Sequence, residues 1–89
     1  MKINNLIMTR KVVNAMVDSE KFKEEVSRAI EKYKGNDWGE ACKSTADDNN
    51  MNLNGIEEIF AVYETCKGII WIITEYERKN TTVLFSDEY

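Results

Sequence analysis

Few side chains in this chain could do chemistry, and histidine is not among them. Histidine is the commonest general base and a common metal ligand, so Ser–His and Cys–His nucleophile pairs are excluded. The four glycines are isolated, so there is no glycine-rich phosphate loop. Adjacent carboxylates occur at Asp47-Asp48 and Glu57-Glu58, but neighbouring residues on a strand point to opposite faces, which prevents a shared site. These patterns predict a protein without enzymatic activity.

The two cysteines, Cys42 and Cys66, allow one metal hypothesis. Their sulfur atoms could bind a structural zinc ion, completed by carboxylates such as Asp37 or Asp47. The alternative is a pair of buried free thiols, because the cysteines are 24 residues apart and form no C-x-x-C motif. No other cofactor is expected, and two cysteines are too few for a disulfide framework.

Length and composition predict one globular domain over residues 1–89. The hydrophobic fraction of 43%, with three Phe, four Tyr and two Trp, is enough for a core. The N-terminal apolar residues are interrupted by Asn4 and Asn5, so no signal peptide is predicted. The longest apolar run, residues 69–73, is too short to span a membrane, and a cytoplasmic protein is expected.

The net charge of −4 is unevenly distributed. Residues 1–44 hold nine Lys/Arg against seven Asp/Glu, and residues 45–89 hold three against nine. Phosphate binding needs Lys and Arg, so nucleic acid is disfavoured as a direct ligand of the acidic half. A basic protein surface is the expected partner there, and the alternative is that these carboxylates serve solubility.

Local signals predict a helical part over about residues 9–55. Thr9 can cap a first short helix, and Asp18 or Ser19 can start a second helix that Gly35 ends. Asp37-Trp38-Gly39-Glu40 is typical of a capping box, and Thr45-Ala46-Asp47-Asp48 repeats that signal. This region is therefore expected to form one kinked helix or two short helices, ended by Gly55. The asparagine-rich residues 49–54 have low helix propensity. The expected inward residues are Phe22, Val26, Ala29, Ile30 and Tyr33 in the second helix, and Ala41, Cys42, Ala46 and Leu53 in the third.

The period changes to two in the last third, which predicts a β meander over about residues 57–86. The expected strands are residues 58–66, 69–77 and 81–86, with Lys67-Gly68 as a hairpin turn that places Tyr63 opposite Ile72. The central strand carries the run I-I-W-I-I-T-E-Y, which is apolar on both faces. The predicted fold is therefore α+β, with N-terminal helices packed on a three-stranded antiparallel C-terminal sheet.

The two faces of this predicted sheet differ in composition. The expected helix-covered face carries Ile59, Ala61, Tyr63, Ile70, Ile72, Tyr76, Val83 and Phe85. The other carries Phe60, Val62, Trp71, Ile73 and Leu84 among Glu58, Glu64, Glu75 and Glu77. Apolar anchors within a carboxylate rim predict a partner-binding surface, whose expected contact residues are Glu58, Phe60, Glu64, Trp71, Glu75 and Glu77. The alternative is that a further helix covers this face.

The chain resembles an uncharacterised family of short proteins encoded on plasmids, phages and integrated elements. The pattern of that family is D-W-G…N-D…L…Y…W-I-I-T-E-x-D-R…T-T-x-L-x-P-x-E-Y, and the similarity covers about residues 9–89. This sequence departs from the pattern at Asn50, at Tyr76-Glu77 and at Ser86. Some relatives carry an extra cysteine beside the Cys66 position, which is missing here. The matching residues are Asp37-Trp38-Gly39, Cys42, Asn49, Leu53, Tyr63, Trp71 to Glu75, Arg78, Thr81 to Leu84 and Asp87 to Tyr89.

The resemblance carries no enzymatic activity, but it implies a bacterial host and a mobile-element setting. Small acidic proteins from that setting include anti-CRISPR and anti-restriction inhibitors, which this sequence resembles in size and charge. The expected function is inhibition of a bacterial defence nuclease, with the CRISPR effector of a type II system as the expected partner. The alternative is a regulatory or structural accessory of plasmid or phage maintenance, for which a homo-oligomer joined through the same sheet face is one form.

Overall fold

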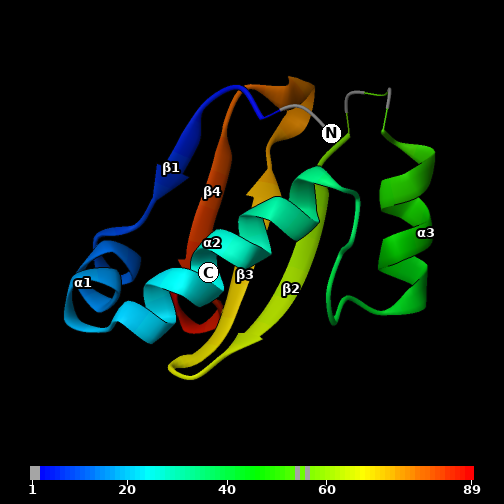
Figure 1. The fold of residues 1–89 in the computed structure, drawn as a ribbon. Coiled ribbons are helices and arrows are strands. Elements are labelled where there is room, and N and C mark those ends of the chain that lie inside the picture. Colours follow the sequence, from blue (N-terminus) through cyan, green and yellow to red (C-terminus); the bar gives the residue numbers. More distant parts are fainter. Residues whose placement is uncertain (1–2, 54, 56) are drawn as a thin grey trace.

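The protein is an α+β fold with three helices and a four-stranded mixed sheet in the part of the chain that a computed structural model describes, residues 3–53, 55 and 57–89 (Figure 1). No helix in these residues is long and apolar enough to cross a membrane. In chain order the elements are β1 (Leu6–Met8), α1 (Arg10–Asp18), α2 (Glu20–Lys34), α3 (Lys43–Met51), β2 (Ile59–Thr65), β3 (Gly68–Thr74), the 3₁₀ turn η1 (Tyr76–Arg78), β4 (Thr81–Phe85) and the 3₁₀ turn η2 (Ser86–Glu88).

The sheet has the strand order β1-β4-β3-β2. The antiparallel meander β2-β3-β4 confirms the three predicted strands, whereas β1, which pairs parallel to β4, was not predicted. Three residues are too few to show a period-two pattern, so β1 carries no local strand signal. Its position depends on distant contacts: the side-chain amides of Asn4 and Asn5 donate to the carbonyls of Arg78 and Lys79 at 3.2 and 3.0 Å.

Helix α1 begins after the predicted cap Thr9, and α2 begins after Ser19, one of the two predicted start residues, and ends at the predicted Gly35. The Thr9 hydroxyl accepts the Val12 N–H at 3.3 Å, and the Ser19 hydroxyl accepts the Phe22 N–H at 3.1 Å. These bonds satisfy amides that have no partner within the helix. Gly35 caps the C-terminus of α2.

Helices α1 and α2 lie on the same face of the sheet (Figure 1). The predicted apolar stripe of α2 packs there, with Ile30 half-buried and the other members buried. The phenyl rings of Phe22 and Phe85 stack with centroids 5.5 Å apart. The sheet residues that complete this core are Ile59, Ala61, Tyr63, Ile70, Ile72, Val83 and Phe85, all of them predicted for this face.

The β2–β3 hairpin has a different register from the predicted one. Tyr63 pairs with Ile70 rather than Ile72, and Thr65 pairs with Gly68, so Cys66 and Lys67 form the turn. The Thr65 hydroxyl closes this turn by donating to the Gly68 carbonyl at 2.5 Å and accepting the Lys67 N–H at 3.2 Å. The shift amounts to two residues along β3. Because side chains alternate with a period of two, every residue within the two strands keeps its predicted face.

Strand β3 ends at Thr74, three residues earlier than predicted. The Glu75 N–H donates to the Asn80 carbonyl at 2.8 Å, and the chain enters η1 with Glu77 at φ 62°. Tyr76 was expected in the core, and that expectation is wrong: its side chain leaves the sheet and is 53% exposed.

Residues 37–42 form a loop, so the predicted capping box at Asp37 is wrong. Gly39 has φ 64°, which is a left-handed conformation that interrupts a helix. The Asp37 carboxylate accepts the N–H of Gly39 at 3.0 Å, within the loop. Helix α3 begins at Lys43, with Cys42 as its cap residue, and Thr45 to Asp48, which repeats the capping signal, lies inside it. Among the other residues predicted inward, Ala41, Ala46 and Leu53 are half-buried against the core, whereas Cys42 is exposed; Asn54 lies outside the described residues.

A buried polar chain links α2 to the sheet. The Tyr33 hydroxyl lies 2.6 Å from the Thr74 hydroxyl and donates to the Ile59 carbonyl at 3.4 Å. The Thr74 hydroxyl lies 2.9 Å from that of Thr81, on β4. Burial raises the pKa of Tyr33 to about 12 and also raises the pKa of Tyr63.

These raised pKa values predict loss of stability at high pH. An unfolded tyrosine loses its proton near pH 10, whereas folded Tyr33 keeps it until about pH 12, so the folded state binds more protons in that interval. The contribution of Tyr33 to the free energy of unfolding should therefore be constant below about pH 10 and fall as the pH rises above it. Urea unfolding at pH 8 to 11 measures this fall. Tyr33→Phe should make the fall shallower and cost about 1 to 2 kcal/mol at pH 7, because the Thr74 hydroxyl and the Ile59 carbonyl lose a partner. Tyr76→Phe, at an exposed position, is the matched control and should change neither quantity; equal pH profiles for all three proteins would contradict the prediction.

Candidate protein-interaction face

One face of the sheet is covered by none of the helices in the described residues (Figure 1). Phe60 and Val62 in β2, Trp71 and Ile73 in β3, and Leu84 in β4 alternate with the core residues and therefore point to this face. Cross-strand pairs Val62–Trp71 and Trp71–Leu84 place these side chains side by side. The sequence left open whether a further helix covers this face, and none of the described helices does. We call this surface, which carries Phe60, Val62, Trp71, Ile73 and Leu84, the open face.

An aromatic cluster lies at the centre of the open face. The Trp71 ring contacts the Phe60 ring edge to face, with centroids 4.8 Å apart and an interplanar angle of 70°. The Tyr89 ring contacts Trp71 from the other side, at 5.1 Å and 61°. Such edge-to-face pairs are favourable beyond the area that they bury. The cluster is pre-formed, so a partner that binds it does not have to order these rings.

The apolar side chains of the open face are only partly shielded from water. Ile73 and Leu84 are buried between their neighbours, whereas Phe60, Val62 and Trp71 are half-buried and Tyr89 is 77% exposed. Ile69 at the start of β3 is 43% exposed. Half-buried and exposed apolar side chains on a sheet face that none of the described helices covers are typical of a protein-binding site.

Of the four carboxylates predicted to surround this surface, two lie on or next to β2 and two lie beyond the end of β3. Glu64 is exposed on β2, on the same side of the strand as Phe60 and Val62, and Glu58 directly precedes β2 and is also exposed. Glu75 and Glu77 lie beyond the end of β3, so their expected place on the strand is wrong. The Glu75 carboxylate accepts a hydrogen bond from Asn80 at 3.2 Å, and the Glu77 carboxylate lies 3.7 Å from the Lys79 ammonium.

The outer edge of β2 is covered, which the sequence did not reveal. The side-chain amide of Asn49 donates to the Phe60 carbonyl at 2.7 Å and accepts the Phe60 N–H at 3.2 Å. Two positions along, the Val62 N–H donates to the Trp38 carbonyl at 3.2 Å, and its carbonyl accepts the Glu40 N–H at 2.6 Å. The backbone groups of Phe60 and Val62, two of the three outward-pointing residues of the strand, are thus satisfied, and these are the two apolar anchors of the open face in β2.

The residues of the D-W-G motif serve this same edge. The buried indole of Trp38 packs edge to face on Tyr33, with centroids 5.5 Å apart, and donates to the Asn50 side chain at 2.9 Å. The Tyr63 hydroxyl donates to the Asp37 carbonyl at 2.6 Å. The Arg78 guanidinium donates to the carbonyls of Asn52 and Glu57 and so ties the region after α3 to η1. Much of the resemblance noted in the sequence therefore falls on residues that hold the fold together.

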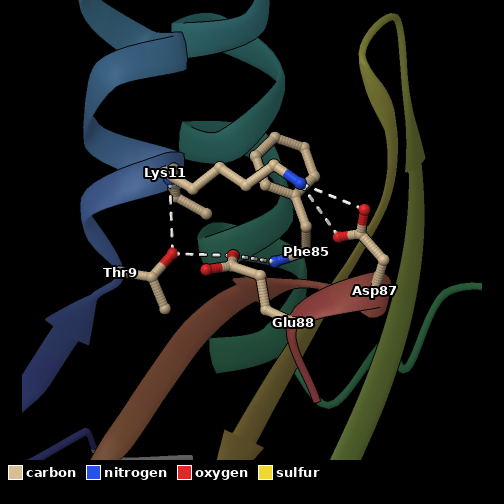
Figure 2. A network of polar contacts seen from close by, with 6 residues as sticks. Thr9, Lys11, Phe85, Asp87 and Glu88 are labelled. Atoms are coloured by element: carbon tan, nitrogen blue, oxygen red, sulfur yellow. Dashed lines mark hydrogen bonds and ion pairs between the residues drawn. The ribbon is translucent and has the colours of Figure 1, made fainter.

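Figure 2 shows the contacts that hold the residues just before Tyr89, whose ring lies against Trp71 of the open face. One oxygen of the Glu88 carboxylate accepts both the Thr9 hydroxyl at 2.9 Å and the Phe85 N–H at 2.8 Å. The Lys11 ammonium lies 3.0 Å from the nearer Asp87 carboxylate oxygen and 5.1 Å from the centroid of the Phe85 ring. These contacts fix the last turn of the chain against the start of α1, which limits where Tyr89 can lie.

The two cysteines lie in different elements. Cys42 caps α3, and its thiol lies 3.2 Å from the Thr45 hydroxyl, which lowers the pKa of Cys42. Cys66 lies in the β2–β3 turn, where the carboxylate of Glu25 raises the pKa of the thiol and accepts the Cys66 N–H at 3.0 Å. Both cysteines are exposed, so the alternative of buried thiols is wrong. Within the described residues no group of three or more Cys, Asp or Glu side chains is arranged to hold a metal ion.

Comparisons of the chain with protein-family models, with curated proteins and with solved structures found no match. The class of protein is therefore described by its own geometry: a small α+β domain with a rigid, partly apolar open face in its acidic half.

Proposed function

We propose that this protein is an inhibitor encoded by a phage or another mobile element, and that it binds a bacterial defence nuclease in the host cytoplasm. The proposed target is the CRISPR effector nuclease of a type II system. The observation that carries the proposal is the open face, where Phe60, Trp71 and Tyr89 form a pre-organised aromatic cluster without a covering helix. Clustered aromatic residues of this kind dominate the binding energy of many protein interfaces.

The proposed mechanism is steric and electrostatic. Residues 45–89, which contain most of the open face, hold nine Asp/Glu against three Lys/Arg. A surface of this charge attracts the Lys and Arg side chains with which a nuclease holds phosphates. Once the aromatic cluster is docked, the inhibitor occupies the path of DNA or guide RNA. Catalysis by the inhibitor itself is not required.

An open four-stranded sheet with exposed aromatic rings is also the platform on which some domains stack single-stranded RNA. Charge argues against that role here, because a nucleic-acid-binding sheet needs cations along the strand path. Glu64 lies beside the anchors of the open face, and Glu58 lies at the entry to β2. A protein partner with a basic surface therefore fits the open face better than a nucleic acid does.

The experiment compares two substitutions that each replace an exposed glutamate with lysine, one on the open face and one away from it. Glu64→Lys changes the open face, and Glu24→Lys changes an exposed position on α2, away from that face. Binding to a purified type II effector is measured by surface plasmon resonance at about 50 and 500 mM salt, a range over which the Debye length falls several-fold. We expect Glu64→Lys to weaken binding at least tenfold, or about 1.4 kcal/mol, Glu24→Lys to leave it unchanged, and high salt to reduce the effect of Glu64→Lys.

Absence of binding to any type II effector would refute the target. Binding that neither salt nor Glu64→Lys changes would refute the electrostatic mechanism. Binding of single-stranded RNA by the protein, weakened by Trp71→Ala, would replace the inhibitor with a nucleic-acid-binding role.

A further inference from the structure

The two edge strands of the sheet, β2 and β1, differ in whether other parts of the chain cover them. The β2 edge is covered by Asn49 and by the loop around Gly39, whereas β1 ends the strand order on the other side. The Asn5 carbonyl and the Thr9 N–H both form hydrogen bonds with β4. Because backbone groups alternate along a strand, Ile7, which lies midway between them, also directs its N–H and carbonyl toward β4. The backbone groups of Leu6 and Met8 therefore point outward, and no strand of the described chain lies there to pair with them.

Apolar side chains surround this open edge. Leu6 is 42% exposed on the helix side of the sheet, and Ile7 is 44% exposed on the open-face side. On the helix side, Val13 and Val17 of α1 are 43% and 81% exposed. A groove of about 220 Å³ beside them is lined by Met8, Val13, Met16, Val17 and Lys23. Proteins usually protect an edge strand with lysine, proline or a bulge, or by keeping it very short; β1 has three residues, and Leu6–Met8 contains no lysine, proline or bulge.

We propose that β1 pairs with β1 of a second copy of this chain, antiparallel, to form a continuous eight-stranded sheet. Centred on Ile7, this pairing exchanges backbone hydrogen bonds between Leu6 of one copy and Met8 of the other. It places Ile7 opposite Ile7 as a non-hydrogen-bonded pair, in which side chains approach most closely. It also extends the apolar surface of Val13 and Val17 across the twofold axis.

Two observations favour a second copy over another occupant. In the described part of the chain β1 is the uncovered edge, since β2 is covered along Phe60 and Val62, so pairing of β1 with β1 closes as a symmetric dimer and does not continue into a filament. The charges along the register are compatible as well. Arg10 comes opposite Asn4 of the other copy, and Thr9 comes opposite Asn5, so no cation faces a cation in this register.

The dimer does not depend on the proposed nuclease target. Its twofold axis is perpendicular to the sheet, so both open faces lie on the same side and present two aromatic clusters. A partner with two matching sites would then be bound with avidity.

Disulfide trapping tests the register directly. In a chain whose native cysteines are replaced (Cys42→Ser and Cys66→Ser), Ile7→Cys would bring two thiols together across the twofold axis, at a Cα separation that a disulfide accepts. We expect mild oxidation to convert Ile7→Cys to a covalent dimer. Ile69→Cys is the matched control, since Ile69 is the same residue type at 43% exposure in another part of the sheet, and it should stay monomeric.

Sedimentation equilibrium supplies the second measurement. The unmodified chain should show a concentration-dependent monomer–dimer equilibrium. Ile7→Lys should weaken association at least tenfold, because it places like charges opposite each other, and Ile69→Lys should not. Circular dichroism of both variants shows whether they are folded. A chain that stays monomeric up to about 1 mM, a concentration at which even very weak dimers form, would overturn the proposal. So would a dimer that Ile7→Lys leaves intact, or one that only Trp71→Ala abolishes, because such a dimer would use another surface.

Discussion

Replacing the solvent-exposed Gly39 with alanine should destabilise the fold by about 3 kcal/mol or more. An alanine at φ 64° costs about 1 kcal/mol in a left-handed conformation. Its Cβ would also overlap the Val62 carbonyl oxygen and stand 2.7 Å from Cδ1 of Tyr63. The Val62 oxygen is backbone in a strand and cannot rotate away, so the loop must move. That movement breaks the bonds from Glu40 to Val62 and from Val62 to Trp38, each worth about 1 kcal/mol.

Gly35→Ala is the matched control for this prediction. Gly35 has φ −85°, and a Cβ there would meet its nearest atom at 3.5 Å, which is an ordinary contact. Its unfolding free energy should stay within about 1 kcal/mol of the parent protein. Urea unfolding followed by circular dichroism compares the three proteins. If Gly39→Ala and Gly35→Ala had the same midpoint, the tight approach of the loop to β2 would be wrong.

Asn49→Ala should cost about 2 to 4 kcal/mol. The change removes the two hydrogen bonds to Phe60 and leaves a backbone N–H and a carbonyl of β2 without partners, which costs about 1 to 3 kcal/mol for each group that stays buried. Asn49 itself is 2% exposed, so the alanine also leaves a small void. Asn49→Asp keeps the acceptor for the N–H but turns a carboxylate oxygen toward the Phe60 carbonyl, and should be comparably destabilising.

The control for this prediction is Asn14→Ala, at an exposed position within α1. Both substitutions gain a few tenths of a kcal/mol of helix propensity, so their difference isolates the contact with β2. Thermal and urea unfolding should place Asn14→Ala at or above the parent protein and Asn49→Ala well below it. Equal stabilities would show that water replaces Asn49 at the strand edge without loss.

The edge of β2 also shows why its role could not be predicted. Asp37-Trp38-Gly39-Glu40 has the composition of a capping box, and a local interpretation expects a helix there. The actual partner of Glu40 is the carbonyl of Val62, 22 residues away in the sequence. Gly39 could have indicated a loop, because a glycine within a predicted first helical turn can also adopt the left-handed conformation that it has here.

The open face was largely predictable, although the register was not. Side-chain alternation assigned Phe60, Glu64 and Trp71 to one face, and a shift of two residues leaves that assignment unchanged. Glu75 and Glu77 were misplaced because the W-I-I-T-E-Y run has no residue that marks the end of a strand. Strand β3 ends at Thr74, where the side-chain hydroxyl is engaged by Tyr33 and Thr81.

The sequence by itself determined the helix caps at Thr9 and Ser19, the end of α2 at Gly35, the antiparallel order of the last three strands and the residues on each face. All of these depend on neighbours within a few positions, where capping chemistry and side-chain period act. Tertiary structure alone decided the addition of β1, the cover over β2 and the placement of Tyr89. Those features depend on hydrogen bonds between distant residues, such as Thr9 and Glu88, which are 79 positions apart. Such bonds require the core to bring the two ends of the chain together, so no local sequence pattern predicts them.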